Sequence, residues 1–252
     1  MGKANRIPMT ERLNRFLARA GVASRRASDR LIQTGSVKIN GAVVTHPGTR
    51  LNPHSDRVCV NGRAIQSVDR QTYILFHKPP GYLVSARDPH HAQTIYKLLR
   101  GIDARVFPAG RLDLDTRGVL LLMDDGDLAF RLTHPRYGVK KVYRAWVRGH
   151  PSEAVLTALR EGIKLNDGIS APAHIRVMRA RGGDTELELV LQEGRKRQVK
   201  RMCEAAGHRV QSLTRTHFAG LTTRHLDPGQ WRHLTQAEVK RLREMVGLYH
   251  EQ

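Results

Sequence analysis

The chain has 252 residues, 40% of them hydrophobic, which is enough to bury the cores of two modest domains. Lys and Arg outnumber Asp and Glu by 43 to 23, and the net charge of +20 favours a polyanionic partner over a small neutral ligand. No apolar run reaches about 18 residues and no charged-then-apolar leader opens the chain, so we expect no membrane span and a cytoplasmic location. The two cysteines, Cys59 and Cys203, lie far apart without a CxxC pair, which argues against a disulfide framework and a cysteine metal site.

The first segment, residues 10–66, is predicted to form a small unit that begins with two short helices. Thr10 is a candidate N-cap for the first helix, which we expect to stop at Gly21. Ser24 is a candidate N-cap for the second, which we expect to stop at Gly35. The unit therefore opens with a helix pair.

Two stretches that follow, residues 37–44 and 58–65, alternate apolar and polar side chains around an Asn-Gly pair. Asn and Gly tolerate the positive φ angles that a two-residue hairpin turn requires, so both stretches are predicted to be β-hairpins.

Charge in this segment is lopsided, with ten Lys and Arg against three acids. Each arginine alone is explained as a solvated residue on an amphipathic helix. Their cluster favours RNA binding, because the guanidinium fork suits phosphate oxygens and stacks on unpaired bases. The candidate RNA-binding residues are Arg25, Arg26, Arg30 and Lys38. The stretch RLNRFLARAGVASRRASDRLIQTGSVKINGAVV, residues 12–44, resembles the alpha-L RNA-binding domain, which implies RNA binding but no chemistry.

A polar stretch, residues 67–72, is predicted to link this domain to a second one over residues 73–248. Strand-like apolar runs alternate there with helical ones, which predicts a mixed α+β fold built on an antiparallel sheet. The helix candidates cover residues 152–161, 196–206 and 236–245, the last behind a capping box of Thr235 and Glu238.

The segment GRLDLDTRGVLLLMDDGD, residues 110–127, carries Asp113 and Asp115 just before an apolar run. One interpretation is a turn that punctuates a buried strand. A calcium loop is a second, but Arg117 stands at a ligand position and no glutamate stands at the twelfth. The third is a catalytic carboxylate, held rigidly by the strand and kept ionised by basic surroundings.

A second candidate segment, EGRKRQVKRMCEAAGH, covers residues 193–208. Its apolar residues recur at helical spacing and are expected to face the core: Val199, Met202, Cys203 and Ala206. Its cations begin before the helix, where they oppose the helix dipole, so we expect an anion nearby, either Asp113 or RNA phosphate. The candidate RNA-binding residues here are Lys196, Arg197, Lys200 and Arg201.

These two segments, with KKVYRAWVRG at residues 140–149, resemble the three motif regions of the ribosomal RNA pseudouridine synthases that carry an N-terminal alpha-L domain. The likeness extends over nearly the whole chain, including HKPPGYLVSARDP and LDPGQWRHLTQAE. It implies isomerisation of a uridine within RNA, in which the N1 glycosidic bond breaks, uracil rotates and C5 rejoins the ribose. It implies neither cofactor nor metal.

Within the resemblance, Asp113 of GRLD is the catalytic aspartate, and Asp115 lies at a variable motif position. Tyr143 matches the tyrosine that stacks on the target base, and Arg195 matches the arginine paired with the aspartate. Val199 matches the aliphatic lining of the uracil pocket. The implied substrate-binding residues are thus Tyr143, Arg195, Val199 and, beside the aspartate, Arg111.

Two positions depart from the family pattern: Arg117 stands where Ser is common and Val119 where Leu is common. We expect Arg117 to influence substrate choice. The expected partner is ribosomal RNA, with that of the large subunit favoured over that of the small subunit. We expect a monomer that binds neither a membrane nor a metal. The alternatives are a synthase acting on small-subunit RNA and a non-catalytic ribosome assembly factor that keeps the synthase fold.

Overall fold

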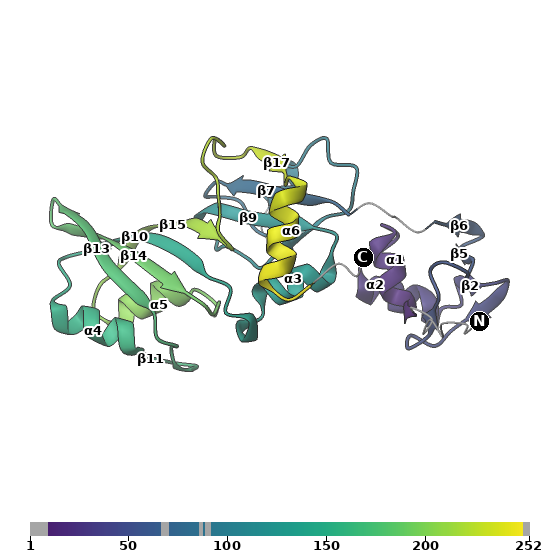
Figure 1. Cartoon of the computed structure of the whole chain (residues 1–252), viewed down its shortest axis with the longest axis horizontal. Helices are drawn as coiled ribbons and strands as arrows, with labels where there is room; N and C mark the ends of the chain where they lie inside the picture. Colours follow the sequence, from purple (N-terminus) through teal and green to yellow (C-terminus); the bar gives the residue numbers. More distant parts are fainter. Residues whose placement is uncertain (1–9, 67–70, 86–87, 89–91, 249–252) are drawn as a thin grey trace, which may run out of the picture. The chain divides into compact units, whose positions relative to one another are not determined.

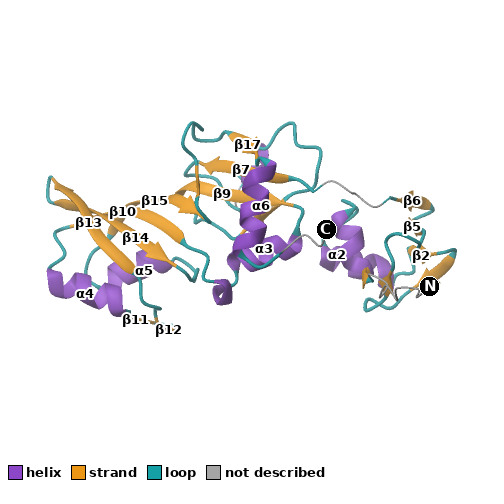
Figure 2. Ribbon diagram, in the orientation of Figure 1, coloured by secondary structure: helices purple, strands orange, loops and turns teal. Residues whose placement is uncertain are grey.

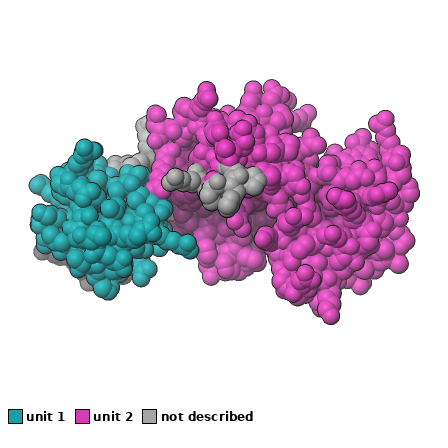
Figure 3. All heavy atoms as spheres, turned by 180° about the vertical axis from the view of Figure 1, so that it is seen from behind, with its two compact units in different colours: residues 1–71 teal, residues 72–252 magenta. Residues whose placement is uncertain are grey.

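The computed structural model describes residues 10–66, 71–85, 88 and 92–248. The chain divides into two compact units, Met1–Gln71 and Thr72–Gln252 (Figure 3). The division falls inside the expected linker, residues 67–72, of which 67–70 lie outside the described residues.

Unit 1 contains the predicted helix pair, α1 (Leu13–Arg19) and α2 (Arg25–Gln33). The Ser24 hydroxyl accepts the Ala27 amide at 3.3 Å, which confirms the predicted cap of α2. The predicted Thr10 cap of α1 is wrong. Before α1 begins, the chain forms strand β1 (Glu11–Arg12), which pairs with β4 (Arg50–Leu51) and delays the helix to Leu13.

Both hairpins of unit 1 form as predicted, β2 (Val37–Ile39) with β3 (Ala42–Val44) and β5 (Val58–Val60) with β6 (Arg63–Ile65). Asn40 and Asn61 have φ angles of 50° and 49°, and the glycine after each is also left-handed, as this turn requires. The strands join in the order β3-β2-β5-β6. A core of helix and strand side chains holds the unit together: Leu13, Phe16, Leu17, Ile32, Val37, Leu51, Val58 and Val60.

Unit 2 is organised around a nine-stranded sheet whose main path runs β13-β14-β10-β15-β9-β7-β17. The strands on this path are β7 (Tyr73–Lys78), β9 (Arg117–Met123), β10 (Lys141–Arg148), β13 (His174–Arg181), β14 (Asp184–Leu191), β15 (Val210–Phe218) and β17 (Trp231–His233). The two off the path are β8 (Phe107–Ala109), beside β9, and β16 (Leu221–Thr222), beside β15. The prediction of an antiparallel sheet needs one correction, because β9 and β15 pair in parallel and make the sheet mixed.

Helices cover opposite faces of the two halves of this sheet (Figures 1 and 2). On β9, Val119 and Leu121 pack in the core beneath α3 (Gly126–Thr133) and α6 (Gln236–Met245), while Leu120 and Leu122 pack on the opposite face. The other half carries α4 (Glu153–Glu161) and α5 (Gln198–Ala205) over β10, β13 and β14. The remaining elements are η1 (Ile95–Lys97), η2 (Pro135–Tyr137), β11 (Lys164–Leu165) and β12 (Gly168–Ile169).

The capping box predicted for α6 is confirmed, with Thr235 and Glu238 forming it. Helix α4 begins one residue later than predicted, because Ser152 is its N-cap and accepts the Val155 amide. Helix α5 begins at Gln198, two residues later than predicted, because Arg197 takes a left-handed φ of 52° at its cap. None of the helices in the described ranges has the length and apolar character that a bilayer crossing requires.

Candidate active site

Asp113 lies in the loop, residues 110–116, that joins β8 to the buried strand β9. The Asp113 carbonyl accepts the Thr116 amide at 3.1 Å and closes a turn. No donor in the described part of the chain bonds the Asp113 carboxylate, which lines a pocket of about 510 Å³. The carboxylate is therefore open to a ligand while its backbone is fixed.

Lys78, the last residue of β7, fixes that loop from beneath. Its side chain is fully buried, and Nζ donates to the carbonyls of Pro79, Leu114 and Thr116 at 3.0, 3.1 and 2.8 Å. Burial lowers the pKa of Lys78 to about 8, although the charges of Asp115 and Asp113 oppose this shift. A single buried cation thus holds the backbone on either side of Asp115 and directly after Asp113.

The pocket has an apolar floor and a cationic rim. Leu112, Leu191, Leu213 and Val199 are each less than a tenth exposed and supply much of the floor. Tyr143, on β10, also lines it and packs against the cores of both halves of the sheet. Four cations line the rim: Arg111, Arg195, Lys196 and Arg197. Such a pocket suits a planar base below an anionic backbone.

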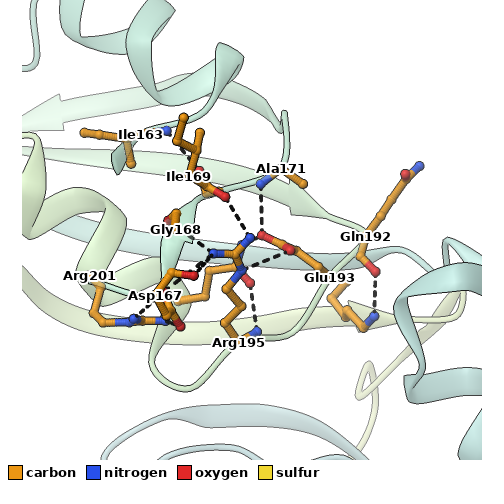
Figure 4. Close-up of polar contacts among 12 residues, drawn as sticks. Ile163, Asp167, Gly168, Ile169, Ala171, Gln192, Glu193, Arg195 and Arg201 are labelled. Carbon is orange, nitrogen blue, oxygen red and sulfur yellow. Dashed lines mark hydrogen bonds and ion pairs between the residues drawn. The ribbon is translucent and has the colours of Figure 1, made fainter. Parts of the chain in front are cut away.

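The Arg195 guanidinium points to the β11–β12 hairpin and to Glu193 (Figure 4). It donates to the backbone carbonyls of Asp167, Gly168 and Ile169 at 3.3, 3.2 and 2.7 Å, and Nε lies 3.2 Å from the Glu193 carboxylate. The expected ion pair between Arg195 and Asp113 does not form among the described residues. The guanidinium bonds the three backbone carbonyls of the β11–β12 hairpin instead.

Two neighbouring contacts complete this hairpin clamp. Arg201 binds the Asp167 carboxylate through two hydrogen bonds of 2.8 and 3.0 Å, and the Glu193 carboxylate accepts the Ala171 amide at 3.0 Å (Figure 4). The hydrogen bonds and charge of Arg201, with the charge of Arg195, hold the pKa of Asp167 below its usual value, although burial opposes this shift. The β11–β12 hairpin is therefore fixed to the rim of the pocket.

Lys200 is the cation that reaches the aspartate loop. Its Nζ is hydrogen bonded to the Asp115 carboxylate, and its side chain is only 12% exposed. Burial alone would raise the pKa of Asp115, but the hydrogen bond and charge of Lys200 outweigh it and lower that pKa. The anion expected near α5 is thus Asp115 rather than Asp113.

The candidate RNA-binding residues divide into open and engaged groups. Lys200 and Arg201 are paired with carboxylates, so they are not free to bind phosphate as expected. The others are exposed and form no ion pair within the described part of the chain: Arg25, Arg26, Arg30, Lys38, Lys196 and Arg197.

Sequence reasoning missed Lys78 and Gly118. Lys78 shares strand parity with Ile74 and Phe76, which are both core residues, so the alternation of β7 contained a signal. Gly118 has a φ of 116°, and a Cβ there would lie 2.1 Å from the Arg215 carbonyl oxygen. Only glycine permits this approach of β9 to β15.

Among the described residues, no group of three or more His, Cys, Asp or Glu side chains is placed to hold a metal ion. The pocket instead joins an open carboxylate, a half-buried tyrosine and an apolar floor on a strongly basic chain. Two family models match this chain: RNA pseudouridylate synthase over residues 72–205 and the S4 domain over residues 11–58. The chain belongs to the RNA pseudouridine synthase family.

Relatives of known sequence span almost the same length. The chain is 44% identical over 95% of its length to a protein of Aquifex aeolicus named as an uncharacterized RNA pseudouridine synthase, covering 96% of that protein. It is 42% identical over 94% of its length to ribosomal large subunit pseudouridine synthase B of Bacillus subtilis, covering 97% of it. A crystal structure of a pseudouridylate synthase, 31% identical, matches 92% of this chain and 99% of its own with a TM-score of 0.66.

Proposed function

We propose that this pseudouridine synthase modifies a uridine of ribosomal RNA, and specifically of the large subunit, with Asp113 as its catalytic residue. The observation that carries this is the open Asp113 carboxylate on a loop fixed by Lys78, facing a base-sized pocket. The likeness to a large-subunit synthase supports the choice of RNA. We propose that the chain acts as a monomer in the cytoplasm without metal or cofactor.

The target uridine is flipped from its stack, because a base within a helix is out of reach of the pocket. Tyr143 stacks on the uracil and offsets part of the unstacking cost of a few kcal/mol, while Val199 contacts its edge. Asp113 then starts cleavage of the N1 glycosidic bond, by attack or by abstraction of a proton. Uracil turns within the pocket and C5 bonds C1′ of the ribose, as Asp113 gives back the bond or the proton that it took. C5 then loses its proton and N1 gains one, so the product is an isomer of the substrate.

The cations at the rim of the pocket hold the RNA backbone while the uracil rotates. Arg111, Lys196 and Arg197 bind phosphate, while Arg195, which lines the pocket, holds the β11–β12 hairpin through its guanidinium. The open arginines of α2 add affinity without reading sequence, so the shape of the RNA selects the site.

Release of tritium from transcripts labelled at uridine C5 tests the proposal. Wild-type chain is expected to release tritium from large-subunit RNA and not from small-subunit RNA. Asp113→Asn is expected to release none, whereas Asp103→Asn, at an exposed carboxylate outside the pocket, matches the wild type. Release by Asp113→Asn at the wild-type rate would overturn the catalytic role, and release from small-subunit RNA alone would overturn the proposed substrate.

A further inference from the structure

Three aromatic rings gather where α3 ends and η2 begins. The ring centroid of Phe130 lies 5.0 Å from that of His134 and 6.4 Å from that of Tyr137. His134 and Tyr137 are also 6.4 Å apart, at an interplanar angle of 82°. This aromatic cluster, Phe130, His134 and Tyr137, lies outside the pocket lining described above.

The cluster is open to solvent although it is rich in apolar surface. Phe130 is 50% exposed, His134 is exposed, and Tyr137 is half-buried. A single exposed ring is ordinary, but three rings in contact form a surface with the π-faces on which bases stack.

A guanidinium completes the surface. Arg136 Cζ lies 4.6 Å from the Tyr137 ring centroid and 5.7 Å from that of Phe130, and the guanidinium donates to the Tyr137 hydroxyl. No carboxylate in the described ranges pairs with Arg136, which leaves most of its five N–H donors free. A stacking surface beside an unneutralised cation matches a nucleotide, which has both a flat base and a phosphate.

The cluster is rigid before any ligand arrives. Arg131 donates to the carbonyls of Val246 and Gly247 at 3.0 Å each and lies 5.6 Å from the Tyr137 ring, which fixes α3 to the end of α6. His134 Nδ1 accepts the Arg136 amide at 3.3 Å and caps η2. Little conformational entropy is therefore lost when a base binds.

The cluster also borders the pocket. Thr133, which ends α3, lies 3.3 Å from where a Cβ of Gly110 would stand, and Gly110 lines the pocket. A Cβ of Gly138, just after η2, would lie 3.9 Å from the Gln192 side chain, next to the pocket residues Leu191 and Glu193. The cluster therefore adjoins residues that line the pocket.

We propose that Phe130, His134 and Arg136 bind an unpaired nucleotide that flanks the target uridine, with its base on the rings and its phosphate on the guanidinium. This inference rests on the proposed function, because it assumes that RNA occupies the pocket. It adds a site that reads the presence of a base near the target rather than its identity.

The test compares two single-stranded RNA probes of about ten nucleotides, oligouridylate and an abasic analogue with the same backbone. The double variant Phe130→Leu/His134→Asn keeps apolar packing and a side-chain cap but removes both rings. Its Kd for oligouridylate is expected to rise at least about fivefold, and its Kd for the abasic probe to stay within about twofold. Arg136→Gln is expected to weaken both probes, because both carry the phosphate that the guanidinium binds.

Matched controls are Val177→Ala, an exposed apolar residue on β13, and Arg181→Gln, an exposed cation on the same strand, which are expected to bind oligouridylate as wild type does. Oligouridylate with one 5-iodouridine, irradiated with the full chain, is expected to crosslink to Phe130, His134 or Tyr137. Unchanged oligouridylate affinity in a folded double variant, or crosslinks confined to other residues, would overturn the inference. Absence of tritium release by wild-type chain would instead refute the proposed function, so the two failures are separate.

Discussion

Lys200 bonds Asp115 and so joins the first turn of α5 to the loop that carries Asp113. Asp115 is 69% exposed and Lys200 is 12% exposed, so water screens the carboxylate much more than it screens the ammonium group. The contact ties the cationic helix to the loop that carries Asp113, and its loss is expected to be measurable.

Lys200→Met is expected to lower kcat/KM about tenfold, because Asp115 then stands unneutralised near the RNA phosphates. Adding Asp115→Asn is expected to restore part of the loss, with a coupling of about 0.5–1 kcal/mol for a partly exposed pair. A double-mutant cycle of kcat/KM measures this coupling. If the effects of the two substitutions on kcat/KM simply added, the contact between Lys200 and Asp115 would not contribute to activity.

Removal of the Lys78 ammonium is expected to damage both stability and activity. Lys78→Met leaves three carbonyls, that of Thr116 buried and the other two partly buried, without their donor and is expected to lower the free energy of unfolding by about 2–5 kcal/mol. A displaced Asp113 loop is expected to reduce kcat about 10²-fold. Urea unfolding measures the loss of stability and single-turnover assays measure the loss of activity. A wild-type kcat in this variant would contradict the claim that Lys78 holds the Asp113 loop in place.

Lys78 also gives a prediction for pH. Its folded pKa of about 8 lies below its ordinary value of 10.5, so the unfolded chain binds more protons between these values. The free energy of unfolding of the wild type is therefore expected to rise from pH 8 to 10.5 relative to that of Lys78→Met. Lys141, also buried with a pKa near 8, contributes equally to both proteins and cancels. Parallel stability curves would show that Lys78 keeps an unshifted pKa.

Gly118→Ala is expected to destabilise unit 2 by at least about 3 kcal/mol, because its Cβ would overlap the Arg215 carbonyl. Gly101→Ala is the matched control, since its φ of 81° imposes strain but no atom lies within 4 Å of the added carbon. We expect a cost of about 1–2 kcal/mol there. Equal losses in the two variants, measured by thermal unfolding, would contradict a close approach of β9 to β15.

The open arginines of α2 are expected to act through phosphate. Arg25→Ala/Arg26→Ala is expected to weaken binding to ribosomal RNA transcripts and to reduce the slope of log Kd against log salt by about 1 for each lost contact. Arg63→Gln, an exposed cation on the hairpin β5–β6, is the control with an expected wild-type slope. An unchanged slope in the double variant would place the RNA elsewhere.

Local features were predictable because their causes lie within a few residues. The Asn-Gly turns at Asn40 and Asn61 need only two positive φ angles, and the cap Ser24 needs only an amide three residues ahead. Thr10 failed as a cap because its neighbours pair with Arg50–Leu51, about forty residues away in sequence.

Contacts between segments that lie far apart in the chain could not be predicted from the sequence. Nothing near Arg195 reveals that three carbonyls of the β11–β12 hairpin compete for its guanidinium, more than twenty residues earlier. Lys196 and Lys200 are two lysines of the same segment, and the sequence alone does not distinguish them. Only the packing of α5 beside the Asp113 loop gives Lys200 a carboxylate partner. The parallel pairing of β9 with β15 likewise joins segments about a hundred residues apart.

The central claim, that Asp113 isomerises one uridine of large-subunit ribosomal RNA, is tested most directly by mapping pseudouridine in cells. Ribosomal RNA is treated to form the chemical adduct and read by primer extension, in cells with the wild-type protein, without it, and with Asp113→Asn. The account predicts loss of the same single large-subunit site in the deletion and in the mutant. An identical map in all three would contradict it and favour a non-catalytic role in ribosome assembly.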